Sequence, residues 1–138
     1  MADNSPEAVR EMVAASPFHV WFGMRVADIS EGLCDIELDV TPEHRNLIGT
    51  THGGVVSTMA DTAIGLAVRT TLSGDSRHVT TQLNVTYLEK VDSGRLLAAG
   101  RVVRSGSRLA YGEADVRDEE GRLVARAAAT FAVIPVKD

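Results

Sequence analysis

The sequence predicts an α+β fold in which an antiparallel sheet wraps around one long central helix, with a short helix before it. Three observations lead to this prediction. The segment from His52 to Val68 is apolar on nearly every side of a helix, so the rest of the fold must bury it. Six other segments have the alternating or β-branched composition of strands. Short turns join consecutive strands, which indicates antiparallel pairing.

The chain of 138 residues is long enough for one domain with a substantial core, and we expect a single domain over residues 1–138. Residues 1–17 are expected to form a helical extension. Ser5 and Pro6 are typical of a helix start, apolar residues follow at helical spacing, and Pro17 ends the helix. Phe18, Trp21 and Phe22 come next, and we interpret them as core residues, with the lining of an apolar pocket as the alternative.

The strands are expected at residues 24–30, 33–40, 78–88, 95–105, 108–118 and 122–134. The second of them alternates, with Cys34, Ile36 and Leu38 opposite charged neighbours, as a half-buried strand does. A polar connector over 41–51 leads into the long helix. A curved sheet around one helix leaves an edge or a face to cover, so we expect at least a homodimer.

The composition excludes several classes of protein. A net charge of −5, from 14 Lys and Arg against 19 Asp and Glu, gives no basic surface for nucleic acid. No apolar run approaches the roughly 20 residues of a membrane span, and the polar N-terminal segment is unlike a targeting peptide. The single cysteine, Cys34, excludes an intramolecular disulfide, fits a reducing compartment and is expected to be a plain strand residue. We therefore expect a cytoplasmic protein.

One carboxylate stands inside the apolar helix. Asp61 is the only ionisable side chain between Val55 and Val68, and burying it unpaired would cost several kcal/mol. Ser57 and Gly65 lie one turn away on either side, so this face is small and polar. The pattern predicts a helix face that opens on a cleft or a subunit interface. Asp61 is either a structural residue there or a general base or nucleophile.

The start of the same helix favours the catalytic interpretation. His52, Gly53 and Gly54 introduce it, and the two glycines let a ligand approach the backbone closely. The first amides of a helix are unpaired and carry the positive end of its dipole, so they can polarise an acyl oxygen. Two turns, about 11 Å, separate these amides from Asp61. Two antiparallel helices in a dimer would bring the amide of one subunit to the carboxylate of the other.

The segment Asn46 to Gly65, NLIGTTHGGVVSTMADTAIG, resembles the signature of hotdog-fold acyl-CoA thioesterases. Within that family, the segment resembles the phenylacetyl-CoA thioesterase-like branch, which is related to 4-hydroxybenzoyl-CoA thioesterases. The resemblance extends to GMRV at 23–26, TTQLNVTYL at 80–88 and RSGSR at 104–108. It implies hydrolysis of an aryl- or medium-chain acyl-CoA, a homodimer and a tetramer built as a dimer of dimers. Coenzyme A is then part of the substrate, and no cofactor is expected.

The resemblance also implies roles for individual residues. The Gly53 amide polarises the thioester carbonyl, Asn46 lies near the thioester, and His52 orders the loop or the substrate. Asp61 of the partner subunit attacks the thioester carbonyl or activates water. Thr80 occupies the position where some relatives have a serine that orients the water. The substrate and CoA contacts are expected from Gly54 and from the turn formed by Arg104, Ser105, Gly106, Ser107 and Arg108, because arginine binds phosphate well.

Two other functions stay open at this point. One is a hotdog dehydratase or hydratase of acyl thioesters, which also pairs a histidine with a carboxylate. The other is a non-catalytic module that binds acyl-CoA. His19, His44 and His78 have no metal-ligand spacing, so local structural roles are expected for them and no metal site is predicted.

Overall fold

A computed structural model describes residues 3–135. Helices α1 (Pro6–Ala15) and α2 (Pro17–Phe22) precede strands β1 (Arg25–Ser30) and β2 (Leu33–Asp39), and a short 3₁₀ helix (Pro42–His44) leads to the long helix α3 (Gly53–Arg69). Strands β3 (Arg77–Tyr87), β4 (Arg95–Ser105), β5 (Leu109–Asp118) and β6 (Leu123–Ile134) follow. The α+β class is confirmed, and the predicted strands match the observed ones to within a residue or two.

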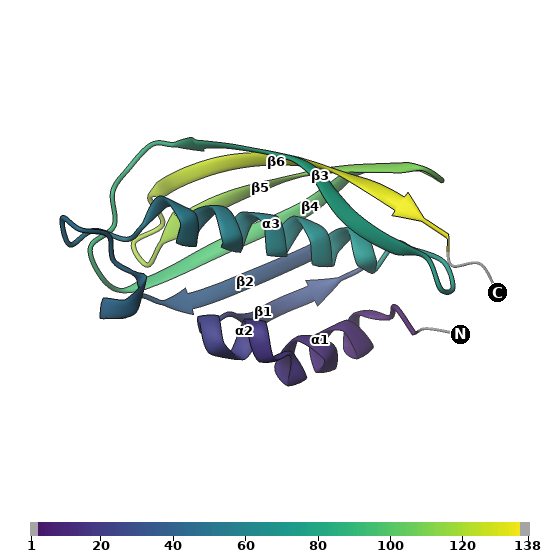
Figure 1. Ribbon diagram of the computed structural model, residues 1–138, viewed down its shortest axis with the longest axis horizontal. Coiled ribbons are helices and arrows are strands. Elements are labelled where there is room, and N and C mark those ends of the chain that lie inside the picture. Colours follow the sequence, from purple (N-terminus) through teal and green to yellow (C-terminus); the bar gives the residue numbers. More distant parts are fainter. Residues whose placement is uncertain (1–2, 136–138) are drawn as a thin grey trace.

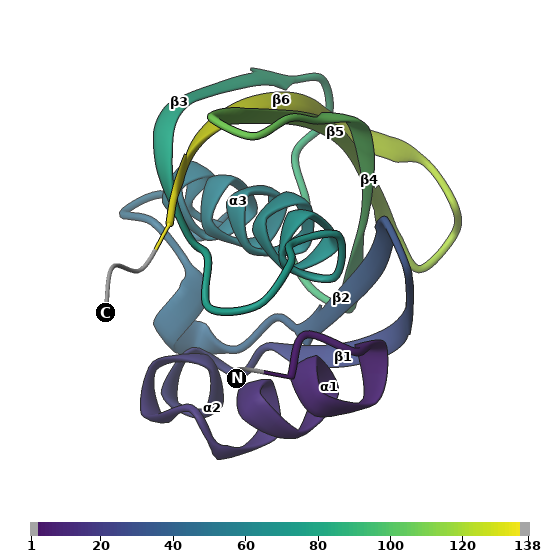
Figure 2. The ribbon, with the colours of Figure 1, turned by 90° about the vertical axis from the view of Figure 1, so that its right-hand side faces the viewer.

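The six strands form one sheet in the order β1-β2-β4-β5-β6-β3, with every neighbouring pair antiparallel. The sheet curves around α3, as Figure 1 shows from the side and Figure 2 shows along the helix. The predicted wrapping of the sheet around the helix is therefore confirmed. Among the described residues, β1 and β3 are the two edge strands, and β3 is hydrogen-bonded only to β6.

The core lies between α3 and the concave face of the sheet. Strand β2 alternates as its sequence predicts, because Cys34, Ile36 and Leu38 are fully buried while the strand's charged residues face outward. From the helix side, Met59 and Ile64 are fully buried in the same cluster. Most of the helix surface is thus buried against apolar side chains, and one face of the helix is left outside the core.

Two strand glycines let the helix approach the sheet. A Cβ atom on Gly100 would lie 2.5 Å from the backbone carbonyl of Ala63 in α3, a separation that side chains do not adopt. A Cβ atom on Gly112 would lie 2.7 Å from the side chain of Ile64. Backbone of α3 and backbone of β4 are therefore in direct contact, and only glycine fits between them.

The N-terminal segment differs from the prediction. Helix α1 ends before Pro17 as expected, but α2 follows at once and ends at Gly23, which has a φ of 91°. The interpretation of the aromatic residues as core is wrong for Trp21, which is 80% exposed, and for Phe18, which is 50% exposed. Six residues are too few for helical periodicity to be seen in the sequence. The segment packs beside β1 instead of entering the core (Figure 1).

Candidate active site

The first turn of α3 presents a free backbone donor, the Gly53 N–H. The His52 N–H donates to the His44 carbonyl at 2.8 Å, and the Gly54 N–H donates to His52 Nδ1 at 2.8 Å. Because Nδ1 accepts a hydrogen bond, the ring proton of neutral His52 lies on Nε2. The Gly53 N–H has no acceptor within residues 3–135. It lies at the positive end of the helix, where a carbonyl oxygen would be stabilised.

Tyr87 fixes the orientation of this turn. Its hydroxyl donates to the Gly53 carbonyl at 2.7 Å, and its ring lies 3.3 Å from where a Cβ on Gly53 would be. The peptide between Gly53 and Gly54 is therefore held at both ends, by Tyr87 and by His52. Tyr87 was not predicted to be a site residue. Its only signal was its place in the segment 80–88 that carries the family resemblance.

Asp61 lies on an open face of α3, as predicted. Asp61, Ser57 and Thr58 are half-buried, whereas the flanking helix positions are buried. Thr80 on β3 donates a hydrogen bond to Asp61 Oδ1 at 2.9 Å, so the structure brings these two site residues together. Gly65 lies one turn further along the same side of the helix, but the open part of the face ends before it. Gly65 is buried, because the rings of Phe131 and His78 pack over it.

Gly53 and Asp61 do not converge within one chain. Eight residues of one helix separate them, which is about 12 Å of rise. An atom in contact with the Gly53 N–H is out of reach of the Asp61 carboxylate of the same chain. The two groups can act on one carbonyl carbon only if a second subunit supplies one of them.

Asn46 organises the loop that precedes α3. Its Oδ1 accepts hydrogen bonds from the Ile48 and Thr50 N–H groups at 3.1 Å, and its Nδ2 donates to Thr50 Oγ1 at 2.8 Å. All of its side-chain polar atoms are thus used by its own loop. Asn46 and His52 line the same surface hollow of about 490 Å³. The loop tip carries Leu47 and Ile48, which are almost fully exposed.

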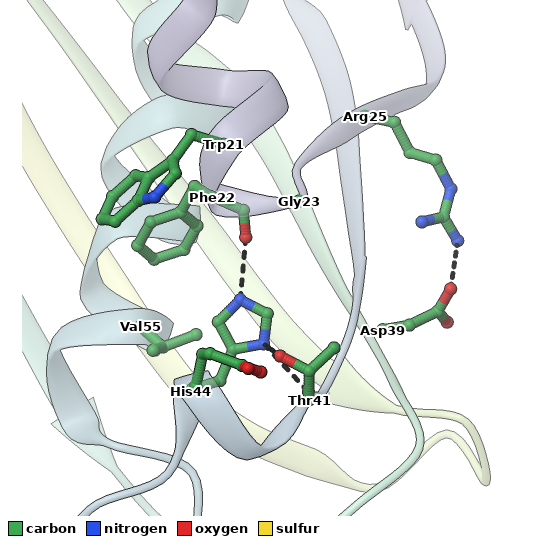
Figure 3. Close-up of a pocket in the computed structure, with 9 residues that line it drawn as sticks. Trp21, Phe22, Gly23, Arg25, Asp39, Thr41, His44 and Val55 are labelled. Carbon is green, nitrogen blue, oxygen red and sulfur yellow. Dashed lines mark hydrogen bonds and ion pairs between the residues drawn. The ribbon is translucent and has the colours of Figure 1, made fainter.

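A second cavity, of about 460 Å³, adjoins the first turn of α3 (Figure 3). Trp21 and Phe22 from α2 and Val55 from α3 give it an apolar wall. Arg25, Asp39, Thr41, Glu43 and His44 give it a polar one. His44 accepts the Thr41 N–H on Nδ1 at 3.0 Å and donates from Nε2 to the Phe22 carbonyl at 2.7 Å, so it ties α2 to the 3₁₀ helix. Trp21 therefore fits the pocket alternative, whereas Phe22 lines the pocket and also packs against the core.

The turn Arg104–Arg108 lies at the other end of α3. Ser105 Oγ is 2.7 Å from Thr71 Oγ1, just beyond the C-terminus of the helix. The 17 residues of α3 place this turn about 25 Å from the Gly53 amide of the same chain. The Gly106 N–H donates a hydrogen bond to the Leu109 carbonyl. Arg104 and Arg108 are exposed, and neither has a carboxylate partner among the described residues. The structure does not bring this turn to Gly53 and Gly54 within one chain.

The remaining histidines have local contacts. His19 Nδ1 is 2.7 Å from Ser16 Oγ, and burial lowers the pKa of His19. His78 packs against Phe131, with ring centroids 5.5 Å apart. No group of three or more His, Cys, Asp or Glu within residues 3–135 is arranged to hold a metal ion. In the same part of the chain, no helix has the length and hydropathy to span a membrane.

Comparisons with known proteins agree on one family. The family model of the thioesterase superfamily matches residues 48–125, more than half of the chain. Acyl-coenzyme A thioesterase 13 of Homo sapiens is 28% identical over 129 residues, covering 91% of this chain and 91% of the human protein. A conserved protein of Pseudomonas aeruginosa is 29% identical, with a TM-score of 0.84 over 91% of this chain and 98% of that one. A Haemophilus influenzae thioesterase shares the fold, with a TM-score of 0.87 at 23% identity over 97% of this chain and 93% of its own.

Proposed function

The chain belongs to the thioesterase superfamily and is a thioester hydrolase with the hotdog fold, and from this premise we propose that it hydrolyses acyl-CoA. The products are a carboxylic acid and free coenzyme A. The name of the human relative, an acyl-coenzyme A thioesterase, supports this substrate class. The observation that carries the proposal is the free Gly53 N–H at the start of α3, in a turn held by His52 and Tyr87.

The free amide matches what hydrolysis of a thioester needs. Attack on the carbonyl carbon puts negative charge on its oxygen, and a fixed donor at the positive end of a helix stabilises that charge. His52 Nε2, which carries the ring proton, offers a second donor beside it. Because the turn is fixed by hydrogen bonds, its donors need no reorganisation when the charge forms.

Asp61 supplies the base or the nucleophile. As a base, it takes a proton from water while the water oxygen bonds to the carbonyl carbon; the C–S bond then breaks and the thiolate takes up a proton. As a nucleophile, its carboxylate oxygen displaces the thiolate, and water cleaves the resulting anhydride. Thr80 is bonded to Asp61 Oδ1 and orients the carboxylate or the water in either case.

The proposal includes a homodimer, because Gly53 and Asp61 are too far apart in one chain. Two α3 helices packed antiparallel, with the two-fold axis near Ser57, bring Gly53 of one subunit to Asp61 of the other. Two features of the described chain fit this arrangement. The polar face of α3 around Ser57 is open, and β3 is an edge strand with an exposed Val79, followed by an exposed Leu88 just beyond its end. Two such dimers then form the expected tetramer.

The acyl and CoA sites follow from the same arrangement. The cavity next to Val55 is apolar on the side of Trp21 and Phe22 and fits an aryl or medium-chain acyl group. An aryl group is the kind hydrolysed by the phenylacetyl-CoA thioesterase-like branch. In antiparallel helices the partner subunit's Arg104–Arg108 turn lies beyond Gly53 along the helix axis. Its two unpaired arginines then bind the phosphates of CoA.

The proposed reaction uses water as its only co-substrate and no cofactor. The cytoplasm is the proposed compartment. The composition of the chain and its single cysteine support that proposal.

Release of free thiol from a panel of aryl and aliphatic acyl-CoAs tests the function, with wild type and Asp61→Asn assayed together. Asp61→Asn is expected to fold normally and to lose about 10²- to 10⁴-fold in turnover, the range for a general base. Asp92→Asn is the matched control, because within residues 3–135 that exposed carboxylate pairs with Lys90 alone, and its loss should leave the rate unchanged. Near-normal rates in Asp61→Asn would contradict the mechanism.

The same assay separates the two other functions. Interconversion of enoyl and 3-hydroxyacyl thioesters without thiol release would indicate a dehydratase or hydratase. Tight binding of acyl-CoA without turnover on any substrate would indicate a binding module.

A further inference from the structure

His44 is hydrogen-bonded to three segments of the chain at once. Its ring Nε2 donates to the Phe22 carbonyl at 2.7 Å, and its ring Nδ1 accepts the Thr41 N–H at 3.0 Å. Its backbone carbonyl accepts the His52 N–H at 2.8 Å. Because a carbonyl can only accept and an amide N–H can only donate, these partners fix the neutral ring with its proton on Nε2. One residue thus joins the end of α2 to the start of α3.

The bond from His44 is what ties α2 to the later part of the chain. Helix α2 has six residues, none of them buried, and Trp21 is 80% exposed. Within residues 3–135, no second hydrogen bond joins α2 to a segment beyond Met24. Phe22 adds apolar contacts, since it packs against the core and lies over the His44 ring with centroids 5.6 Å apart. The position of α2 therefore depends on this imidazole.

Helix α2 carries the apolar wall of the cavity beside the first turn of α3. Trp21 and Phe22 form this wall, and Val55 from α3 lines the same cavity. In Figure 3 the His44 ring lies below Phe22, with a dashed line to the Phe22 carbonyl. Val55 follows Gly53 by two residues, so the cavity and the free amide share one turn of the helix. The position of the wall consequently decides how an acyl group in the cavity lies relative to that amide.

We propose that His44 is a positioning residue that sets the acyl specificity of the site. Its ring holds the aromatic wall, and its backbone carbonyl holds the N–H of His52, the residue that caps the catalytic turn. An acyl group that fills the cavity is thereby placed with its carbonyl at the Gly53 amide, whereas an acyl group too short to reach the wall gains nothing from it. This role rests on the proposed function, in which Gly53 polarises a thioester carbonyl.

His44→Asn and His44→Gln separate the contact with Phe22 from the contact with Thr41. Asparagine can still accept the Thr41 N–H, but its amide is too short to reach the Phe22 carbonyl. Glutamine has an acceptor and a donor about as far apart as the two ring nitrogens, and it is a usual residue at this position of a capping box. It therefore serves as the matched conservative variant.

Thiol release from phenylacetyl-CoA and from acetyl-CoA measures the specificity of wild type and both variants. In His44→Asn, kcat/KM for phenylacetyl-CoA should fall about fivefold relative to kcat/KM for acetyl-CoA, as expected for the loss of one neutral hydrogen bond. His44→Gln should recover most of this ratio. A merely structural role would lower both rates equally. An unchanged ratio in His44→Asn would therefore overturn the inference.

Hydrogen exchange tests the tether without any substrate. The N–H groups of Val20, Gly23 and Met24 are hydrogen-bonded within the segment, so they exchange when α2 opens. They should exchange about fivefold faster in His44→Asn than in wild type or His44→Gln, while the amides of β2 should exchange equally in all three. Equal exchange of the α2 amides overturns the inference, even if the protein hydrolyses acyl-CoA. Absence of turnover by wild type on both thioesters would refute the proposed function, and the exchange rates would still decide whether His44 holds the wall.

Discussion

Thr80 Oγ1 donates a hydrogen bond of 2.9 Å to Asp61 Oδ1 and thereby connects the edge strand β3 to the open face of α3. Asp61 has no ion-pair partner among the described residues, and this hydroxyl is the hydrogen-bond donor that orients its carboxylate. The carboxylate is thus held in place without being paired to a cation. That is the state in which it can take a proton from water or attack a carbonyl carbon.

Replacing Thr80 by valine should therefore impair turnover without unfolding the protein. Valine has the same shape but no hydroxyl, so Asp61 loses its orienting donor. We expect kcat/KM to fall about 10- to 100-fold, less than the roughly 10²- to 10⁴-fold of the base itself, because Thr80 only orients that base. Thr80→Ser keeps the hydroxyl and should stay close to wild type. Steady-state assays of both variants, with circular dichroism as the folding check, decide this, and equal rates for Thr80→Val and wild type would refute the role.

Tyr87→Phe tests the fixed turn at the start of α3. The variant keeps the ring that packs on Gly53 and removes the hydroxyl that bonds its carbonyl at 2.7 Å. The turn should become more mobile and the Gly53 N–H less well placed. We expect kcat to fall about fivefold, corresponding to the roughly 1 kcal/mol of one neutral hydrogen bond. Tyr111→Phe on β5 removes a hydroxyl elsewhere and should have no effect; a Tyr87→Phe enzyme as fast as Tyr111→Phe would exclude the role.

The sequence alone was sufficient to predict most of the fold, because its periodicities are strong. The alternation around Ile36 locates β2, and the long, mostly apolar segment after Gly54 locates α3. The free amide at Gly53 was also predictable, since unpaired donors at a helix start are a general property of helices. These features depend on residues that are close together in the sequence, so they can be predicted without a structure.

Tyr87 could not be found in this way, because a β-bulge decides where it points. The register of β3 shifts between Thr80 and Gln82, which inserts one extra residue into the strand. Simple alternation from Thr80 would place Tyr87 on the face away from α3. With the bulge, Leu83 packs against the core and Tyr87 reaches Gly53. The use of Asn46 by its own loop was hidden for a similar reason, since it depends on backbone geometry and not on residue spacing.

Gly100→Ala should destabilise the protein through the contact between α3 and β4. The added methyl group would lie 2.5 Å from the Ala63 backbone, which cannot move without displacing the helix. We expect the free energy of unfolding to fall by about 1–3 kcal/mol, the usual cost of overpacking. Gly65→Ala is the graded comparison, because its methyl would meet side-chain atoms at 3.3 Å or more and should cost less. Urea unfolding at one fixed protein concentration measures both, and a smaller loss for Gly100→Ala than for Gly65→Ala would contradict the packing argument.

Cys34 should make the stability depend on alkaline pH. Burial in the core raises the pKa of its thiol from 9.0 to about 12, with a smaller contribution from Asp35. The folded state therefore keeps the thiol protonated, while the unfolded chain releases the proton from about pH 9 upward. Below pH 9 the thiol is protonated in both states and the full free energy of unfolding is kept. As the pH rises from 9 towards 12, the free energy of unfolding falls by at most about 1.4 kcal/mol per pH unit.

Comparison with Cys34→Ala isolates this effect from all other pH-dependent contributions to stability. Alanine keeps the site apolar and costs stability at every pH, because it leaves a small cavity in the core. The difference in unfolding free energy between wild type and variant should therefore be constant from pH 7 to 8.5 and shrink between pH 9 and 10.5. A difference that stays constant across the whole range would mean that the thiol ionises equally well in the folded and unfolded chain, which is incompatible with its full burial against β4.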